Sequence, residues 1–312
     1  MKRKILVTAP YLQPVLQDYM HIFKENDMEV LVPQVRERLS EAELLEIIGD
    51  IDGVISGDDK FTAQVLQSAP KLKVISKWGT GIDSIDQDTA KQLGITIRNI
   101  PGAFNEPVAD HVLGLMLSFA RQIPWITEEM RAGRWKKLPC FSLAGKTLGV
   151  IGVGNTGKSV VRRAGCFQLR LIGNDITDMP MDFLEETGIT MLDKQTVLRE
   201  SDFVSVNCEL NPASYHLMGK EEFASMKQTA FFINVARGPL VDEPALIEAL
   251  QKGQIAGAGL DVFEEEPLPS HSPLLQMQNV LLSPHNANSS AEHWNRIHEK
   301  SIANLLEELR HA

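Results

Sequence analysis

The stretch GKTLGVIGVGNTGKSVVRRAGCFQLRLIGND, residues 145–175, carries the pattern that indicates the fold of one half of this chain. An apolar run ends in three glycines spaced as G-x-G-x-x-G, namely Gly152, Gly154 and Gly157, and a helical pattern follows at once. In a strand-turn-helix unit the first glycine permits the tight turn, the second lets a pyrophosphate approach the backbone, and the third allows close helix-strand packing. Phosphate then binds at the helix N-terminus. The stretch therefore predicts a dinucleotide-binding turn.

An acidic residue closes the same stretch. Asp175 ends the next apolar run, eighteen positions after Gly157, about where a carboxylate that binds the adenosine ribose is expected. Alone, the glycines are compatible with an ordinary turn, and Asp175 with a turn residue after its strand. Together they indicate a dinucleotide site. The following segment ITDMP contains no arginine to receive a 2′-phosphate, which favours NAD over NADP.

Strand and helix patterns alternate on both sides of this stretch. Parallel neighbours in a sheet need a crossover connection, so this alternation predicts an α/β fold with two similar, doubly wound parallel sheets of the Rossmann type. The expected strands of the first sheet are 4–9, 29–34, 52–57, 72–77 and 94–100. Those of the second are 146–154, 169–175, 202–207, 230–236, 255–263 and 279–285.

The segment IPGAFNEP, residues 100–107, interrupts the alternation with proline and glycine. Asn105 is placed to cap a long apolar helix over 106–123, and a connector over 122–142 precedes the second sheet. The last segment, 290–312, reads as a helix that returns to the first domain. We therefore expect a discontinuous substrate domain, residues 1–101 and 287–312, and an NAD-binding domain, residues 102–286.

The composition excludes several classes of partner. The 312 residues carry a formal net charge of −10, with 43% apolar and 23% charged residues, as expected of a globular protein. Such an excess of acid disfavours nucleic acid and anionic membranes as partners. No apolar stretch approaches the roughly 18 residues of a membrane span. The cysteines lie far apart, without metal-ligand spacing, which predicts no metal site and a cytoplasmic location.

Three polar residues follow strands of the expected second sheet. Arg237 follows 230–236, Glu266 follows 255–263 by a few residues, and His285 ends 279–285. Ligands of open parallel sheets bind outside the carboxyl ends of the strands. Singly, each residue has an ordinary alternative: a salt bridge, a solvated acid or a turn residue. Together beside a dinucleotide turn they supply a cation for an anionic substrate, a proton donor, and a carboxylate that orients the donor and raises its pKa.

With these residues in place, the sequence resembles the D-isomer-specific 2-hydroxyacid dehydrogenases, a family that includes phosphoglycerate, glycerate, hydroxypyruvate and D-lactate dehydrogenases. The resemblance covers nearly the whole chain. It rests on KWGTGIDSID, on the glycine turn, on INVARGPLVDEPALIEALQKGQIAGAGLDVFEEEPL and on LLSPHNA. It implies Arg237, Glu266 and His285 as the catalytic set, with Glu266 selected over its two acidic neighbours because it directly precedes the proline.

The resemblance also implies further site residues. Backbone N–H groups of Gly79, Thr80 and Gly81 would bind the substrate carboxylate, as would Arg237, and Thr80 would also lie on the nicotinamide side. Asp261 would contact the carboxamide. The remaining cofactor contacts would come from Gly152, Gly154, Asn155, Thr156, Gly157, Asp175, Cys208, Val235 and Ala236. The implied architecture has a cleft between the two domains and forms a homodimer through the nucleotide domain.

Two departures from the family pattern bear on the substrate. Phosphoglycerate enzymes tend to carry an arginine after the third strand, where this chain reads SGDD, residues 56–59. Two acids there disfavour a phosphorylated substrate, although Lys60 or Lys77 could supply charge. Where the family often has histidine, this chain has Asn207 and Cys208, which changes the lining of the cofactor or substrate pocket.

The sequence thus predicts an NAD-dependent D-2-hydroxyacid dehydrogenase that acts on a small, glyoxylate- or hydroxypyruvate-like 2-oxo acid, with phosphoglycerate as a further candidate. Two alternatives stay open. One is an NAD(H)-sensing regulatory protein of the same fold, because corepressors of this fold retain the three catalytic residues. The other is a dehydrogenase for another small anion, such as formate or phosphite.

Overall fold

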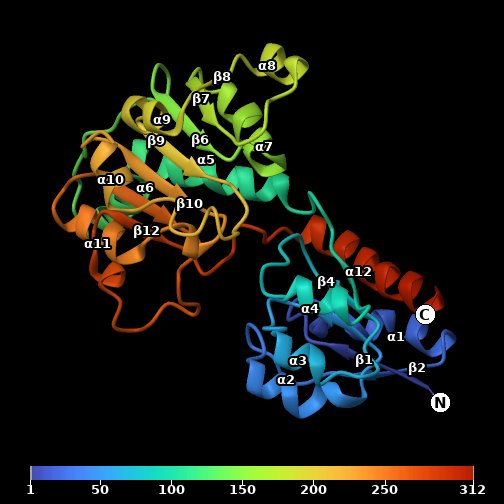
Figure 1. Ribbon diagram of the computed structural model, residues 1–312. Helices are drawn as coiled ribbons and strands as arrows, with labels where there is room; N and C mark the ends of the chain where they lie inside the picture. The colour runs from blue at the N-terminus through green and yellow to red at the C-terminus, as the bar shows by residue number, and fades with distance from the viewer. Residues whose placement is uncertain (1, 312) are drawn as a thin grey trace. The chain divides into compact units, whose positions relative to one another are not determined.

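The computed structural model describes residues 2–311, which divide into two compact units. The first unit runs to Phe104 and resumes at Ser290, and the second is Asn105–Ser289. The sequence placed these breaks after residues 101 and 286. Each unit is built on one sheet whose strands all pair in parallel (Figure 1). The predicted α/β class with two parallel sheets is confirmed.

The first unit has the sheet order β2-β1-β3-β4-β5, the doubly wound order of flavodoxin-like folds. Its strands are β1 (Arg3–Val7), β2 (Met28–Leu31), β3 (Gly53–Ser56), β4 (Val74–Lys77) and β5 (Thr96–Arg98). Its helices are α1 (Leu16–Glu25), α2 (Glu41–Ile47), α3 (Ala63–Gln67), α4 (Gln87–Gln92) and α12 (Ala291–His311), with 3₁₀ turns η1 (Gln13–Val15) and η2 (Ile48–Asp50).

Helix α12 closes the first unit, although it comes from the end of the chain (Figure 1). It packs against β3 and β4. Ser76 on β4 donates a hydrogen bond of 2.8 Å to the carbonyl of Ser301. Gly53 on β3 lacks a side chain where Leu305 approaches, since a Cβ there would lie 2.8 Å from a Leu305 methyl group. The buried leucine face of α12 therefore forms part of the core of this unit.

The second unit has the sheet order β12-β11-β10-β9-β6-β7-β8, which is the Rossmann order extended by one strand. Its strands are β6 (Thr147–Ile151), β7 (Arg170–Asn174), β8 (Thr190–Met191), β9 (Phe203–Val206), β10 (Phe231–Asn234), β11 (Gly257–Leu260) and β12 (Val280–Leu282). Its helices are α5 (Asn105–Arg121), α6 (Ile123–Arg131), α7 (Asn155–Gly165), α8 (Met181–Thr187), α9 (Lys194–Glu200), α10 (Lys220–Ser225) and α11 (Glu243–Gln251), with η3 (Gly238–Leu240) and η4 (Pro273–Gln276).

The long helix expected over 106–123 is α5, and a second helix, α6, follows it within the expected connector. α5 ends at Arg121, Gln122 adopts a left-handed conformation with φ of 51°, and α6 begins at Ile123. Pro124 explains the break, because proline lacks an N–H and its ring clashes with the carbonyl four residues earlier. That carbonyl, of Ala120, instead accepts a hydrogen bond of 2.9 Å from the backbone N–H of Phe141. Part of the expected connector over 122–142 is therefore helical.

The central strands of the second sheet are buried on both faces. Every residue of β6 and β9 is buried, as expected when helices cover both sides of a parallel sheet. β8, with two residues, is too short to show in the sequence pattern. Among residues 2–311, no helix combines the length and the apolar character that crossing a bilayer requires.

Candidate active site

The three glycines of the second unit's first turn have different surroundings. Gly152 has a φ of 86°, and a Cβ there would lie 2.6 Å from the backbone nitrogen of Cys208. A Cβ on Gly157 would lie 2.1 Å from the carbonyl oxygen of Gly152. Gly154, in contrast, has no such neighbour within 4 Å. There is therefore no space for a side chain at the first and third glycines, whereas the second has free space beside it. A pyrophosphate would approach the N-terminus of α7 at this second glycine.

Asp175 follows β7 beside this turn. One carboxylate oxygen accepts a hydrogen bond of 2.6 Å from the backbone N–H of Val153, and the other accepts bonds from the N–H and the hydroxyl of Thr177. Burial alone would raise the pKa of Asp175, but the hydrogen bonds from Thr177 and Val153 outweigh it and lower the pKa. An ionised carboxylate thus stands beside the glycine turn, as ribose recognition requires.

The other predicted cofactor residues of this unit surround the same edge of the sheet. Asn155 begins α7, and the hydroxyl of Thr156 lies 3.3 Å from the side-chain oxygen of Asn105. Val235 is buried and Ala236 half-buried directly after β10. Burial raises the pKa of the Cys208 thiol to about 11. At neutral pH this cysteine can therefore contact a ligand only as a neutral thiol.

The turn after β10 holds Arg237. The side chain of the buried Asn234 holds this turn with two hydrogen bonds. Its amide nitrogen donates a bond of 2.8 Å to the Arg237 carbonyl, and its amide oxygen accepts a bond of 3.1 Å from the Ala236 N–H. Gly238 lies directly against the segment after β11, where a Cβ would be 1.8 Å from the carbonyl oxygen of Phe263. Only glycine lets these two segments approach so closely.

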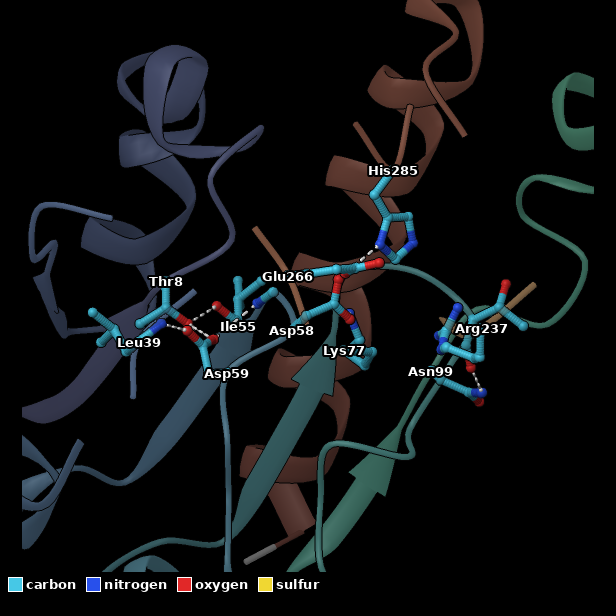
Figure 2. Close-up of polar contacts among 12 residues, drawn as sticks. Thr8, Leu39, Ile55, Asp58, Asp59, Lys77, Asn99, Arg237, Glu266 and His285 are labelled. Atoms are coloured by element: carbon cyan, nitrogen blue, oxygen red, sulfur yellow. Dashed lines mark hydrogen bonds and ion pairs between the residues drawn. The ribbon is translucent and has the colours of Figure 1, made fainter. Parts of the chain in front are cut away.

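The side chains of Glu266 and His285 lie within hydrogen-bond distance of each other in the second unit (Figure 2). Glu266 Oε2 lies 3.0 Å from His285 Nδ1, and Glu266 Oε1 accepts 3.0 Å from the Phe263 N–H. Both side chains are partly buried, 17% and 22% exposed respectively. Of the two neighbouring acids, Glu264 pairs instead with His216, at 2.7 Å, and Glu265 is exposed. The structure therefore brings together the acid and the imidazole that the sequence singled out.

Asp261, the expected carboxamide contact, is fully buried after β11. Its carboxylate accepts hydrogen bonds from the turn that carries His285, including 2.8 Å from the Asn286 N–H and 2.9 Å from the Ala287 N–H. The Ser283 hydroxyl also donates to Asp261, and His111 lies 3.0 Å from that hydroxyl. Neither Ser283 nor His111 was predicted from the sequence as a site residue. Serine and histidine at these positions carry no spacing signal, and the contacts join segments far apart in the chain.

The predicted carboxylate-binding turn, Gly79–Gly81, belongs to the first unit. Gly79 has a φ of 128°, which favours glycine. The hydroxyl of Thr80 donates 3.0 Å to the Ile100 carbonyl, and the side-chain amide of Asn99 donates 2.6 Å to the Thr80 carbonyl. Hydrogen bonds from the hydroxyl of Thr80 and to its carbonyl thus connect the turn after β4 to the chain after β5.

The acidic turn after β3 differs from its expected arrangement. Asp59 is fully buried and directed into the unit, where it accepts hydrogen bonds from the Leu39 N–H and the Thr8 hydroxyl (Figure 2). Burial raises the pKa of Asp59 despite these bonds. Asp58 pairs at 2.9 Å with Lys77, which is only 3% exposed. The idea of two acids presented together to a substrate is therefore wrong: Asp59 is structural and Asp58 has a cationic partner.

Known proteins resemble this chain over most of its length. The family model for the D-isomer specific 2-hydroxyacid dehydrogenase, NAD binding domain, matches residues 113–287. A D-3-phosphoglycerate dehydrogenase of Methanocaldococcus jannaschii is 42% identical over 293 residues, 93% of this chain, but the chain spans only 54% of that relative. A glyoxylate reductase of Korarchaeum cryptofilum is 38% identical over 270 residues, 84% of this chain and 81% of the relative.

A solved structure supports the same comparison. The D-lactate dehydrogenase from Aquifex aeolicus, crystallised with NAD and lactic acid, matches with a TM-score of 0.88 at 25% identity. The match covers 99% of this chain and 98% of that one. The likeness therefore extends across both units and is not confined to the dinucleotide turn.

Proposed function

The chain belongs to the D-isomer-specific 2-hydroxyacid dehydrogenase family, and from this premise we propose that it interconverts a small 2-oxo acid and its D-2-hydroxy acid with NAD(H). The observation that carries the proposal is the pair formed by Glu266 Oε2 and His285 Nδ1 at 3.0 Å. The two residues follow β11 and β12, and the glycine turn follows β6, so they share the carboxyl edge of one parallel sheet.

Each residue of the proposed set has one task. Arg237 binds the substrate carboxylate and polarises the carbonyl. His285 holds a proton on Nε2 for the nascent alkoxide and takes it back in the reverse reaction, because its Nδ1 is occupied by Glu266. Glu266, fixed by the Phe263 N–H, sets the ring orientation and favours the charged imidazolium. NADH, when bound at the glycine turn, supplies the hydride.

The cofactor proposal extends to a preference for NADH over NADPH. The hydrogen bonds that lower the pKa of Asp175 keep its carboxylate ionised, and a carboxylate accepts ribose hydroxyls but repels a 2′-phosphate. We expect kcat/KM for NADH to exceed that for NADPH with the same acid. A value for NADPH equal to or above that for NADH would remove this role of Asp175.

The test is an absorbance assay at 340 nm with glyoxylate, hydroxypyruvate, pyruvate and phosphohydroxypyruvate. His285→Gln should lower kcat by about 10²–10⁴-fold, as expected for a lost general acid, while NADH still binds. His271→Gln is the matched control, since His271 is an exposed histidine in the segment between Glu266 and His285. A fully active His285→Gln would contradict the mechanism. NADH binding without turnover of any acid would instead favour the regulatory alternative.

The proposed assembly is a homodimer through the second unit. Large apolar side chains lie exposed on and after α6: Ile123 at 53%, Met130 at 48% and Trp135 at 85%. Exposed apolar groups that share a surface mark interaction sites, and Ile123 and Met130 lie seven residues apart on one face of α6. Sedimentation should find a dimer that Trp135→Glu weakens, and a parent protein that sediments as a monomer at micromolar concentration would contradict it.

We also propose a cytoplasmic location, which suits the exposed free thiols of Cys140 and Cys166.

A further inference from the structure

One buried residue holds the turn that carries His285. The carbonyl oxygen of Asp261 accepts 2.8 Å from the His285 N–H. One carboxylate oxygen of Asp261 accepts 2.5 Å from the Ser283 hydroxyl and 2.8 Å from the Asn286 N–H, and the other accepts 2.9 Å from the Ala287 N–H. Asp261 therefore accepts hydrogen bonds from His285 itself and from residues on both sides of it. The carboxylate that accepts the flanking bonds is fully buried.

This turn needs such support because His285 has an unfavourable backbone conformation. Its φ is 50°, in the left-handed region that non-glycine residues rarely adopt and that persists only where the surroundings enforce it. The strain lies at the residue whose ring must face both Glu266 and the substrate. Contacts that hold the flanking residues consequently also determine where the imidazole of His285 lies.

A second histidine reaches this network from helix α5. His111 Nε2 lies 3.0 Å from the hydroxyl oxygen of Ser283 and 3.8 Å from Asp261 Oδ1. A hydroxyl has one proton, and Ser283 donates it to Asp261. The Ser283 oxygen can therefore only accept from His111, which requires a proton on Nε2 of that ring. The chain of donors runs from His111 through Ser283 to Asp261.

We infer that His111 is a positioning residue for His285, acting through Ser283 and Asp261. The inference rests on the proposed function of His285 as proton donor. Without the Nε2–H donor, the Ser283 oxygen loses a partner in a partly buried network, and hydrogen bonds in a chain strengthen one another. The Ser283–Asp261 bond weakens, the strained turn relaxes, and the imidazole of His285 moves away from Glu266. Helix α5 thereby takes part in the chemistry without touching the reacting atoms.

Two substitutions of similar polarity separate positioning from packing. In His111→Gln the amide nitrogen can occupy the place of Nε2 and donate to Ser283, whereas the shorter amide of His111→Asn reaches only the place of Nδ1. We expect His111→Asn to lower kcat for 2-oxo acid reduction by about 10–100-fold, the scale of a displaced catalytic group, and His111→Gln to stay within about threefold of the parent. Ser283→Ala should behave like His111→Asn and Ser283→Thr like the parent.

A second measurement is independent of turnover. In a proton NMR titration of the NADH complex, with the His285 signal assigned from the His285→Gln spectrum, His111→Asn and Ser283→Ala should lower the pKa of His285, because the ring loses Glu266. His111→Gln should leave it unchanged. Equal effects of Gln and Asn, or an unchanged His285 titration in His111→Asn, would overturn the inference. A parent that turns over no 2-oxo acid would refute the proposed function while the titration still decides the role of His111.

Discussion

Glu266 holds the proposed proton donor through two contacts, one to the Phe263 N–H and one to His285 Nδ1. A carboxylate at hydrogen-bond distance favours the imidazolium form. Glu266→Gln removes the charge but keeps an acceptor for Phe263, so His285 should lose its proton at a lower pH. Because reduction needs the protonated ring, the decline of kcat/KM with rising pH should begin about one pH unit lower. Profiles from pH 5 to 9 measure this, with the exposed Glu265→Gln as control. A Glu266→Gln profile that superimposes on that of the parent would show that Glu266 does not affect the protonation of His285.

Asp58 is the residue through which the acidic turn after β3 can affect a substrate, since Asp59 is directed inward. Phosphorylated acids should be poor substrates of the parent, because Asp58 neutralises Lys77 and repels a phosphate. Asp58→Asn should raise kcat/KM for phosphohydroxypyruvate roughly tenfold relative to hydroxypyruvate, about 1.4 kcal/mol. Adding Lys77→Met should abolish the gain. Parent rates that are equally high with both acids would show that this turn does not select against phosphate.

At the scale of elements, the site depends on how closely two turns approach. Gly238, after Arg237, leaves no room for a Cβ beside the Phe263 carbonyl. Gly238→Ala should therefore separate the Arg237 turn from the segment that bears Glu266, lower kcat/KM, and reduce the free energy of unfolding by about 1–3 kcal/mol. The matched control is Gly114→Ala within α5, where a Cβ has open space; it should be neutral or stabilising. Urea unfolding and steady-state assays measure both, and a fully active, equally stable Gly238→Ala would contradict the packing.

The elements also show what the sequence could and could not predict. Alternation of apolar runs predicted both parallel sheets, and the carboxyl ends of β10, β11 and β12 could be assigned to one edge because parallel strands end together. The two-residue β8 was missed because two residues are too few to show an apolar pattern. Helix α6 was missed because its proline and mixed polar residues read as part of the connector over 122–142. The inward direction of Asp59 and the bonds among His111, Ser283 and Asp261 were also missed. Such contacts depend on side-chain directions between distant segments, which periodicity does not encode.

At the scale of the whole molecule, the two units should respond differently to acid. His298 on α12 is 2% exposed, and its Nδ1 accepts 2.9 Å from the indole N–H of Trp78. Burial lowers the pKa of His298 below its ordinary value near 6.5. The unfolded chain therefore takes up a proton that the folded unit does not, so stability is complete above pH 6.5 and is lost as the pH falls toward the folded-state pKa. The loss should reach up to about 1.4 kcal/mol per pH unit.

Amide hydrogen exchange between pH 5 and 8 can assign this loss to a unit, after correction for the intrinsic exchange rate. Protection of β3 and β4, which α12 covers, should fall with acid more than protection of β9 and β10 in the second unit. His298→Asn keeps an acceptor at the place of Nδ1 for Trp78 but cannot be protonated, so it should flatten the difference, whereas the exposed His21→Asn should leave it intact. Equal loss of protection in both units, or a slope unchanged by His298→Asn, would mean that the acid sensitivity arises elsewhere. A difference confined to the first unit would tie its pH-dependent stability to the helix supplied by the end of the chain.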